Sequence, residues 1–157
     1  MAYHQEGDTS MINYFKAAER TLSQRGNLEK ALANLERRKE SVIHRAAPSG
    51  VQITDPSKPY VSGGGANDAL TDCLELAEID REIKNTRETV ELVDKVLSEM
   101  PQVEAALLRA WYIEGKSKEE IAEELSYSSK ASIYDLRNKA VSSFAVLFFG
   151  AGALSSI

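Results

Sequence analysis

The sequence predicts an all-α protein in which a long antiparallel, coiled-coil-like helical hairpin is followed by a C-terminal three-helix domain of the helix-turn-helix type. Three observations support this fold class: one long apolar stripe, one cluster of proline and glycine, and a series of shorter helical patterns after Pro101. They divide the 157 residues into a flexible N-terminus (1–10), a hairpin and oligomerisation region (11–100) with a flexible loop (47–67), and a helix-turn-helix domain (101–157).

The composition is typical of a folded protein with a charged surface. The chain has 19 Lys and Arg against 24 Asp and Glu, with 43% hydrophobic residues. Its first ten residues lack the apolar core of a signal peptide. The most apolar stretch, residues 145–154, is about half as long as the roughly 20 residues that a membrane span needs. A single cysteine cannot form an internal disulfide. We therefore expect a cytoplasmic protein with no membrane partner.

The stripe predicts the second helix of the hairpin, over residues 68–100. Its apolar residues recur at steps of three and four, which places them on one side of a helix. The segment 11–46 has a weaker version of the same rhythm, interrupted by Lys39. Three of the four prolines and four of the nine glycines lie between these segments, at 47–67, and predict a loop. The main stripe residues are Leu76, Ile79, Ile83, Val90, Val93 and Leu97.

The stripe also suggests oligomerisation. A hairpin of two helices buries only one seam, so we expect further association through these six residues, most simply as a homodimer. The sequence leaves open whether the stripe packs within one chain or between two chains.

The first two helices of the C-terminal domain are marked by their ends. Gly115 follows an apolar face that includes Leu107 and Trp111, and glycine is the usual residue after a helix end. Ser117 and Glu120 then have the spacing of a capping box, in which each side chain accepts from a backbone N–H of the other residue. A short helix ends near 115 and another begins after 117.

The third helix is predicted to begin at Lys130 and to bury Ile133 and Leu136. In a helix-turn-helix, the second helix of the pair lies in the major groove of DNA. Cations and hydroxyls suit phosphates, whereas Asn and Arg suit base edges. Residues 129–141 carry a local charge of +2. The predicted contacts to double-stranded DNA are Ser129, Lys130, Ala131, Ser132, Tyr134, Arg137, Asn138 and Lys139.

No pattern in the sequence indicates catalysis. The two histidines, His4 and His44, are forty residues apart, and no Cys/His set has metal-ligand spacing. The glycines at 63–65 lack the Lys-Ser/Thr of a phosphate loop. We expect a protein that is not an enzyme, with no catalytic residue, no metal and no cofactor.

Two consecutive stretches carry a resemblance to known families. Residues 107–125, LLRAWYIEGKSKEEIAEEL, resemble the promoter-reading region four of bacterial sigma factors. Residues 127–150, YSSKASIYDLRNKAVSSFAVLFFG, resemble phage and prophage late-gene transcription regulators of the ArpU and RinA type. The second resemblance extends over nearly the whole chain, more strongly after Gln102. It implies a sequence-specific DNA-binding regulator that activates phage late genes, in possible contact with host RNA polymerase.

Two other functions fit the same pattern. A DNA-packaging subunit of the small-terminase kind also joins a helix-turn-helix to oligomerising helices. A protein adaptor could instead use the three-helix domain to bind RNA polymerase without contacting DNA.

Overall fold

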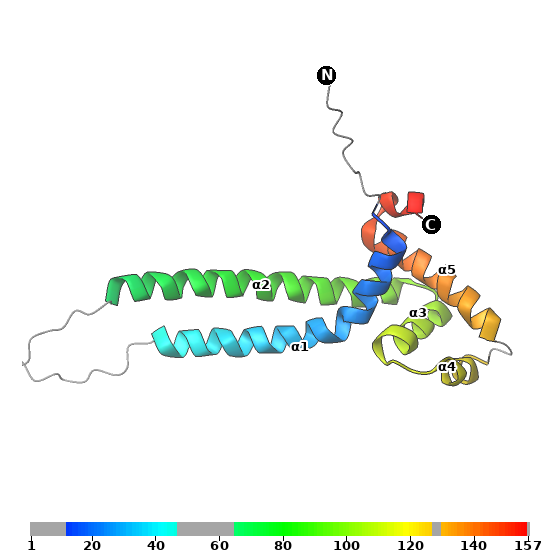
Figure 1. Cartoon of the computed structure of the whole chain (residues 1–157), viewed down its shortest axis with the longest axis horizontal. Coiled ribbons are helices and arrows are strands. Elements are labelled where there is room, and N and C mark those ends of the chain that lie inside the picture. Colours follow the sequence, from blue (N-terminus) through cyan, green and yellow to red (C-terminus); the bar gives the residue numbers. More distant parts are fainter. Residues whose placement is uncertain (1–11, 47–64, 127–129, 157) are drawn as a thin grey trace, which may run out of the picture. The chain divides into compact units, whose positions relative to one another are not determined.

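The structure is a computed structural model that describes residues 12–46, 65–126 and 130–156. None of these residues forms a strand, which confirms the all-α prediction. The predicted flexible N-terminus and most of the predicted loop lie outside them. In chain order the helices are α1 (Tyr14–Ala46), α2 (Gly65–Glu99), α3 (Gln102–Leu108), a π-helical turn (Arg109–Ile113), α4 (Lys118–Glu124), α5 (Lys130–Phe149) and a final 3-10 turn (Ala151–Ser156) (Figure 1).

The chain divides into two compact units, and each of the long helices α1 and α2 has residues in both units. One unit consists of residues 26–91, and the other of the chain up to Arg25 together with the chain from Leu92 onward. The sequence placed the boundary at 100/101, whereas the first part of α1 and the last turns of α2 belong with the C-terminal helices. Helix α2 also begins at Gly65, so the last three positions of the predicted loop are helical. No helix in the described ranges is long and apolar enough to cross a membrane.

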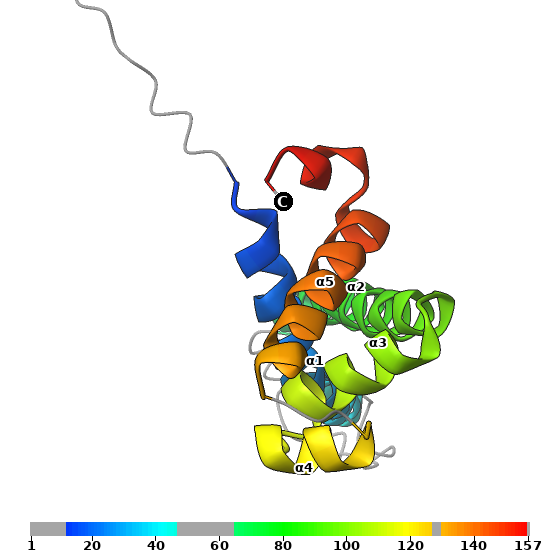
Figure 2. The ribbon, with the colours of Figure 1, turned by 90° about the vertical axis from the view of Figure 1, so that its right-hand side faces the viewer.

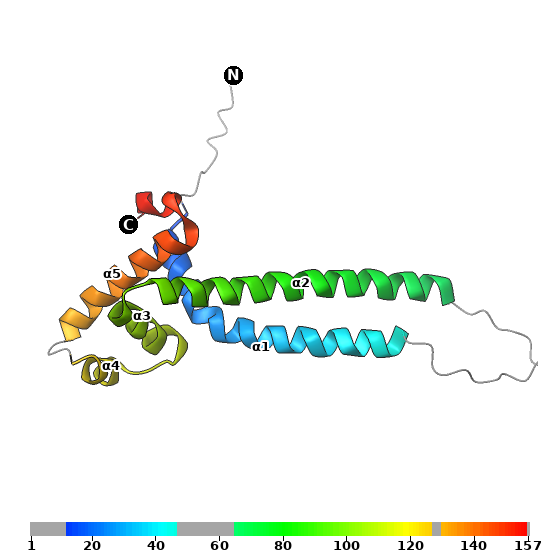
Figure 3. The same cartoon turned by 180° about the vertical axis from the view of Figure 1, so that it is seen from behind.

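The unit of residues 26–91 is the antiparallel hairpin (Figures 1 and 3). Val42 of α1 is buried against Ile79 and Ile83 of α2. Partly buried leucines extend this core on both helices. Lys39, which interrupts the apolar rhythm of α1, forms an ion pair with Asp80 at 2.6 Å. The seam therefore accommodates a lysine because its ammonium group has a carboxylate partner on the other helix.

Ion pairs also link the two helices outside the apolar seam. Arg45 contacts Asp72 at 2.6 Å and Glu75 at 2.9 Å, and Arg38 contacts Glu75 at 3.0 Å. The hydrogen bonds that Glu75 accepts from Arg45, and then from Arg38, hold the pKa of its carboxyl below the ordinary value. Exposed pairs of this kind contribute little stability each, but they favour one register of the two helices.

The predicted oligomerisation stripe packs within a single chain. Ile79 and Ile83 are buried in the hairpin, and Leu76 is partly buried beside them. Val90 is 9% exposed, while Val93 and Leu97 are fully buried. In the structure, the six stripe residues are therefore buried or partly buried within one chain.

The other unit has a larger core. Phe144 of α5 is fully buried and stacks on Phe148 at 5.4 Å between ring centroids. Tyr14 of α1 contacts Phe149 at 5.3 Å between ring centroids, so the start of α1 and the end of α5 share this core. The largest fully buried side chains around them are Leu22, Val93, Val96, Leu97, Leu107, Leu108, Ile121, Ile133 and Val141.

Candidate nucleic-acid interface

Helix α4 begins as the sequence predicts. Gly115 has a φ of +66°, a conformation that glycine adopts without strain. The Ser117 hydroxyl accepts a hydrogen bond from the backbone N–H of Glu120 at 3.2 Å, and the Glu120 carboxylate accepts one from the N–H of Ser117 at 3.0 Å. The predicted capping box is confirmed, and it sets the direction in which α4 leaves the turn.

Helix α4 packs against α5 (Figure 2). Ile121 of α4 and Ile133 of α5 are fully buried in the same core. The chain between them turns through Ser126, whose φ is +56°. Helix α5 begins at Lys130, as predicted. With α4 followed directly by α5, the order of these helices is that of a helix-turn-helix.

One face of α5 is exposed to solvent, on the side of the helix away from the core. Ile133, Ala140 and Phe144 are buried on one side. At about 100° per residue, the opposite side carries Asp135 and Asn138, and both are exposed. This outward face is the surface that a groove could receive.

The edge of the outward face next to α4 carries an aromatic pair with a lysine. The rings of Trp111 and Tyr134 meet edge to face at 5.5 Å. The ammonium of Lys118 lies 5.2 Å from the Tyr134 ring and 5.7 Å from the Trp111 ring. Such cation–π contacts are worth about 0.5–1 kcal/mol at exposed sites. They hold Lys118 beside α5, over a shallow pocket of about 500 Å³.

Arg137 lies on the inner side of the same aromatic pair. Its guanidinium donates to Glu19 of α1 at 3.3 Å and lies 5.1 Å from the centre of the Trp111 ring. The Arg137 side chain is only 22% exposed. Tyr112 donates to the same Glu19 carboxylate at 2.7 Å, and burial, followed by this bond, raises the Tyr112 pKa. The structure therefore gives Arg137 a role within the fold, in contrast to its predicted place on a DNA surface.

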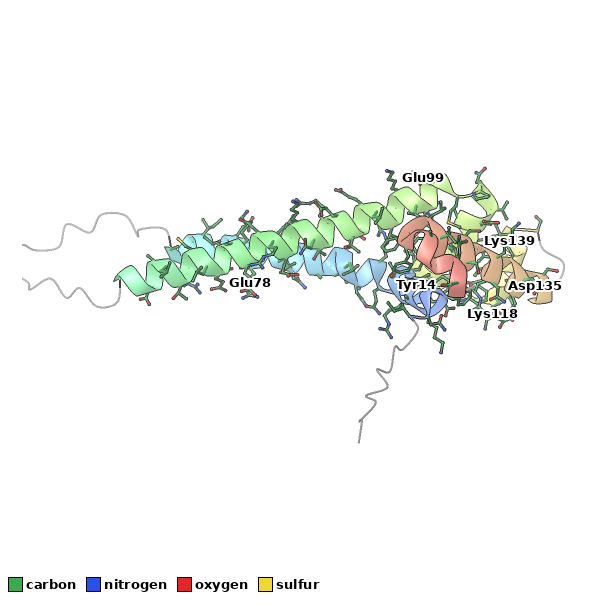
Figure 4. The ribbon with its side chains drawn as sticks, turned by 90° about the horizontal axis from the view of Figure 1, so that it is seen from above. Tyr14, Glu78, Glu99, Lys118, Asp135 and Lys139 are labelled. Carbon is green, nitrogen blue, oxygen red and sulfur yellow. The ribbon has the colours of Figure 1, made fainter. Side chains whose placement is uncertain are left out.

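Lys139 lies at the other edge of the outward face. Its ammonium is 3.4 Å from a Glu104 carboxylate oxygen. The Lys139 side chain is 73% exposed, whereas that of Glu104 is 7% exposed. The lysine thus compensates a buried carboxylate of α3 and still reaches solvent. Figure 4 labels Lys118, Asp135 and Lys139 at the end of the structure that α4 and α5 form. Around the axis of α5, Lys139 is about 140° from Tyr134, which Lys118 contacts.

The predicted DNA-contacting residues therefore divide into groups. Tyr134, Asn138 and Lys139 are exposed on or beside the outward face, and Ser132 is partly buried. Ser129 lies outside the described residues, and Lys130 and Ala131 are in the first turn of α5 without described side chains. Arg137 is turned inward.

Sequence reasoning omitted two residues of this surface, Lys118 and Asp135. No spacing in the sequence joins Lys118 to α5, because the two meet only through the folding of the turn. The helical phase of Asp135 relative to Ile133 was a usable signal, since residues two positions apart lie on nearly opposite sides of a helix.

The exposed groups of this surface are mostly polar. Among the described residues, no three His, Cys, Asp or Glu side chains are placed to hold a metal ion. The outward face instead combines an amide, a carboxylate, a phenol ring and two flanking ammonium groups. Comparisons of this chain with protein-family models, with curated proteins and with solved structures find no match.

Proposed function

We propose that this protein is a sequence-specific DNA-binding transcriptional regulator that inserts α5 into the major groove. The observation that carries this proposal is the outward face of α5, with Asn138 exposed on it and with Lys118 and Lys139 at its two edges. An amide can read adenine through paired hydrogen bonds, and the lysines suit phosphates.

The dimensions of helix and groove support this placement. An α-helix with its side chains is about 10–12 Å wide, and the major groove of B-DNA is about 12 Å wide. A helix that fills the groove therefore has the two sugar-phosphate strands along its two sides. Cations at opposite edges of α5 are where those strands would lie, while Asn138 would face the base edges.

The small number of cations suggests that two copies act together. Each phosphate contact changes the slope of log K against log salt by about 0.9, so one copy with two or three contacts binds weakly. We propose that the regulator is a dimer on DNA, held through a surface other than the hairpin stripe. Activation of phage late genes, with host RNA polymerase as a further partner, is the role that the family resemblance supports.

Fluorescence anisotropy of the full chain with a duplex selected from random sequences tests the proposal. Lys118→Ala should reduce the salt slope by about 0.9 per copy and weaken all duplexes alike. Asn138→Ala should weaken only the selected duplex, by about 5- to 150-fold, with the slope unchanged. Lys84→Ala is the matched control, because it removes an exposed positive charge from the hairpin. Failure of the wild type to bind any duplex at low salt would overturn the proposal.

One observation favours a second candidate function, a protein adaptor. Arg137 and Lys139 are both ion-paired within the chain, so the local positive charge of α5 is partly neutralised. A mixed polar and aromatic surface also suits a protein partner such as RNA polymerase. If Tyr134→Ala abolishes binding to purified RNA polymerase, while the wild type leaves every duplex unbound, the adaptor replaces the regulator.

A further inference from the structure

Asp135 is the one acidic residue of α5, and it lies on the outward face. Its side chain is exposed, and within the described segments no hydrogen bond or ion pair engages its carboxylate. It follows buried Ile133 by two positions, which places it on the side of the helix away from α4 and the core. This carboxylate is therefore free to meet whatever the outward face meets.

The helix geometry places Asp135 among the residues that we propose to read DNA. At about 100° per residue, it is about 60° from Asn138 and 40° from Lys139 around the helix axis. By the same measure it lies between Lys139 and Tyr134, which Lys118 contacts. A helix seated between two phosphate strands would direct Asp135 toward the base edges and the flanking lysines toward the strands.

The chemistry of a carboxylate restricts what it can meet there. An ionised carboxylate accepts hydrogen bonds and donates none. In the major groove, guanine offers two acceptors, and thymine offers an acceptor and a methyl group, so both leave the charge uncompensated. Adenine places an acceptor beside its amino group. The N4 amino group of cytosine is a donor and fits best.

We propose that Asp135 is a specificity-determining residue, which accepts a hydrogen bond from the N4 amino group of a cytosine in the major groove. This inference rests on the proposed DNA-binding function. The negative charge contributes to specificity in two ways. It favours the amino group of cytosine, and it disfavours every sequence without an amino group at that position.

A purely structural role for Asp135 makes a different prediction. The residue is beyond the first turn of α5, so it neither caps the helix nor compensates its dipole. Aspartate is also a poorer helix former than alanine. Asp135→Ala should therefore leave the fold intact and raise its melting temperature slightly. A variant that is as stable as the wild type but has lost base preference separates recognition from folding.

Selection from a random duplex library tests the inference directly, with the full chain as wild type, Asp135→Ala, Asp135→Asn and Glu123→Gln. Glu123→Gln is the control, because it removes one exposed negative charge from α4. The wild type should enrich a site with one cytosine per half-site. Asp135→Ala should no longer require that cytosine, and its preference for cytosine at this position should fall by about 5- to 150-fold. Asp135→Asn should shift that position toward adenine. Glu123→Gln should select the wild-type site.

Two results distinguish failure of this inference from failure of the proposed function. If the wild type enriches a site and Asp135→Ala enriches the same site with undiminished cytosine preference, Asp135 does not determine specificity, although DNA binding stands. If the wild type enriches no site even at low salt, the proposed function fails and the inference falls with it.

Discussion

Arg137 of α5 forms an ion pair with Glu19 of α1, at 3.3 Å between Nη1 and Oε1. The two residues are 118 positions apart in the chain. Tyr112 donates to the same carboxylate oxygen at 2.7 Å, so Glu19 joins three helical segments of this unit. The contact explains why a cation in the middle of α5 is turned away from solvent, and it ties the position of α5 to that of α1.

Arg137→Ala is expected to lower the free energy of unfolding by about 1–2 kcal/mol, because it removes the guanidinium from Glu19 and from the aromatic pair. Urea unfolding followed by circular dichroism measures this change. Arg109→Ala, at an exposed arginine of the same unit, should change stability by less than about 0.5 kcal/mol. An Arg137→Ala protein of wild-type stability that no longer binds duplex DNA would contradict the inward role of Arg137.

The capping box of α4 predicts a second effect. Ser117→Ala removes the acceptor for the Glu120 N–H and should cost about 1 kcal/mol of stability. Glu120→Gln keeps an oxygen acceptor for the Ser117 N–H, so it is the conservative control and should cost less. Thermal melting of both variants makes the comparison. Wild-type stability of Ser117→Ala would contradict the stabilising role of the reciprocal bonds.

The α4–α5 interface depends on Ile121, which is fully buried. Ile121→Ala should lower the free energy of unfolding by about 2–5 kcal/mol, since it leaves a cavity between the two helices. Leu147→Ala is the control, because Leu147 of α5 is 47% exposed and its truncation leaves no enclosed cavity. Denaturant titration of both proteins gives the difference. Unchanged stability of Ile121→Ala would contradict the packing of α4 on α5.

Acid should destabilise the hairpin through Glu75. Because Arg45 and Arg38 lower its pKa in the fold, the Glu75 carboxylate stabilises the folded state above 4.5, its ordinary pKa. That contribution is lost as the pH falls through the folded pKa. At neutral pH the wild type should melt at a higher temperature than Glu75→Gln. This difference in melting temperature should shrink as the pH falls. Glu78→Gln, at an exposed glutamate, should follow the wild type. A constant gap between wild type and Glu75→Gln would contradict this account.

The elements of the fold were largely predictable because their signals are local. The three-and-four spacing from Leu76 onward predicted α2, and Gly115 and Ser117 marked the end of one helix and the start of another. These signals act within a few residues, where backbone sterics and hydrogen bonding decide the structure. The partners of the stripe are not local, because Ile79 and Ile83 pack with Val42, whereas Val93 and Leu97 belong to the core around Phe144. The sequence alone could not assign them.

The candidate interface was less predictable, since charge in a sequence does not show its partner. The sequence predicts Arg137 and Lys139 as surface cations beside Asn138. In the structure, their carboxylate partners lie on α1 and α3. Lys118 belongs to the interface only because Trp111 and Tyr134 meet in the folded unit. Only the three-dimensional structure shows whether a cation is exposed to solvent or forms an ion pair with another helix.

Nuclear magnetic resonance of the isotope-labelled full chain, titrated with its selected duplex, tests most directly whether the outward face of α5 contacts DNA. We predict that the side-chain amide of Asn138 and the backbone amides from Asp135 to Lys139 shift on binding, while the hairpin signals near Val42 and Ile79 stay in place. Shifts confined to the hairpin, or no shift with any duplex at low ionic strength, would contradict the account.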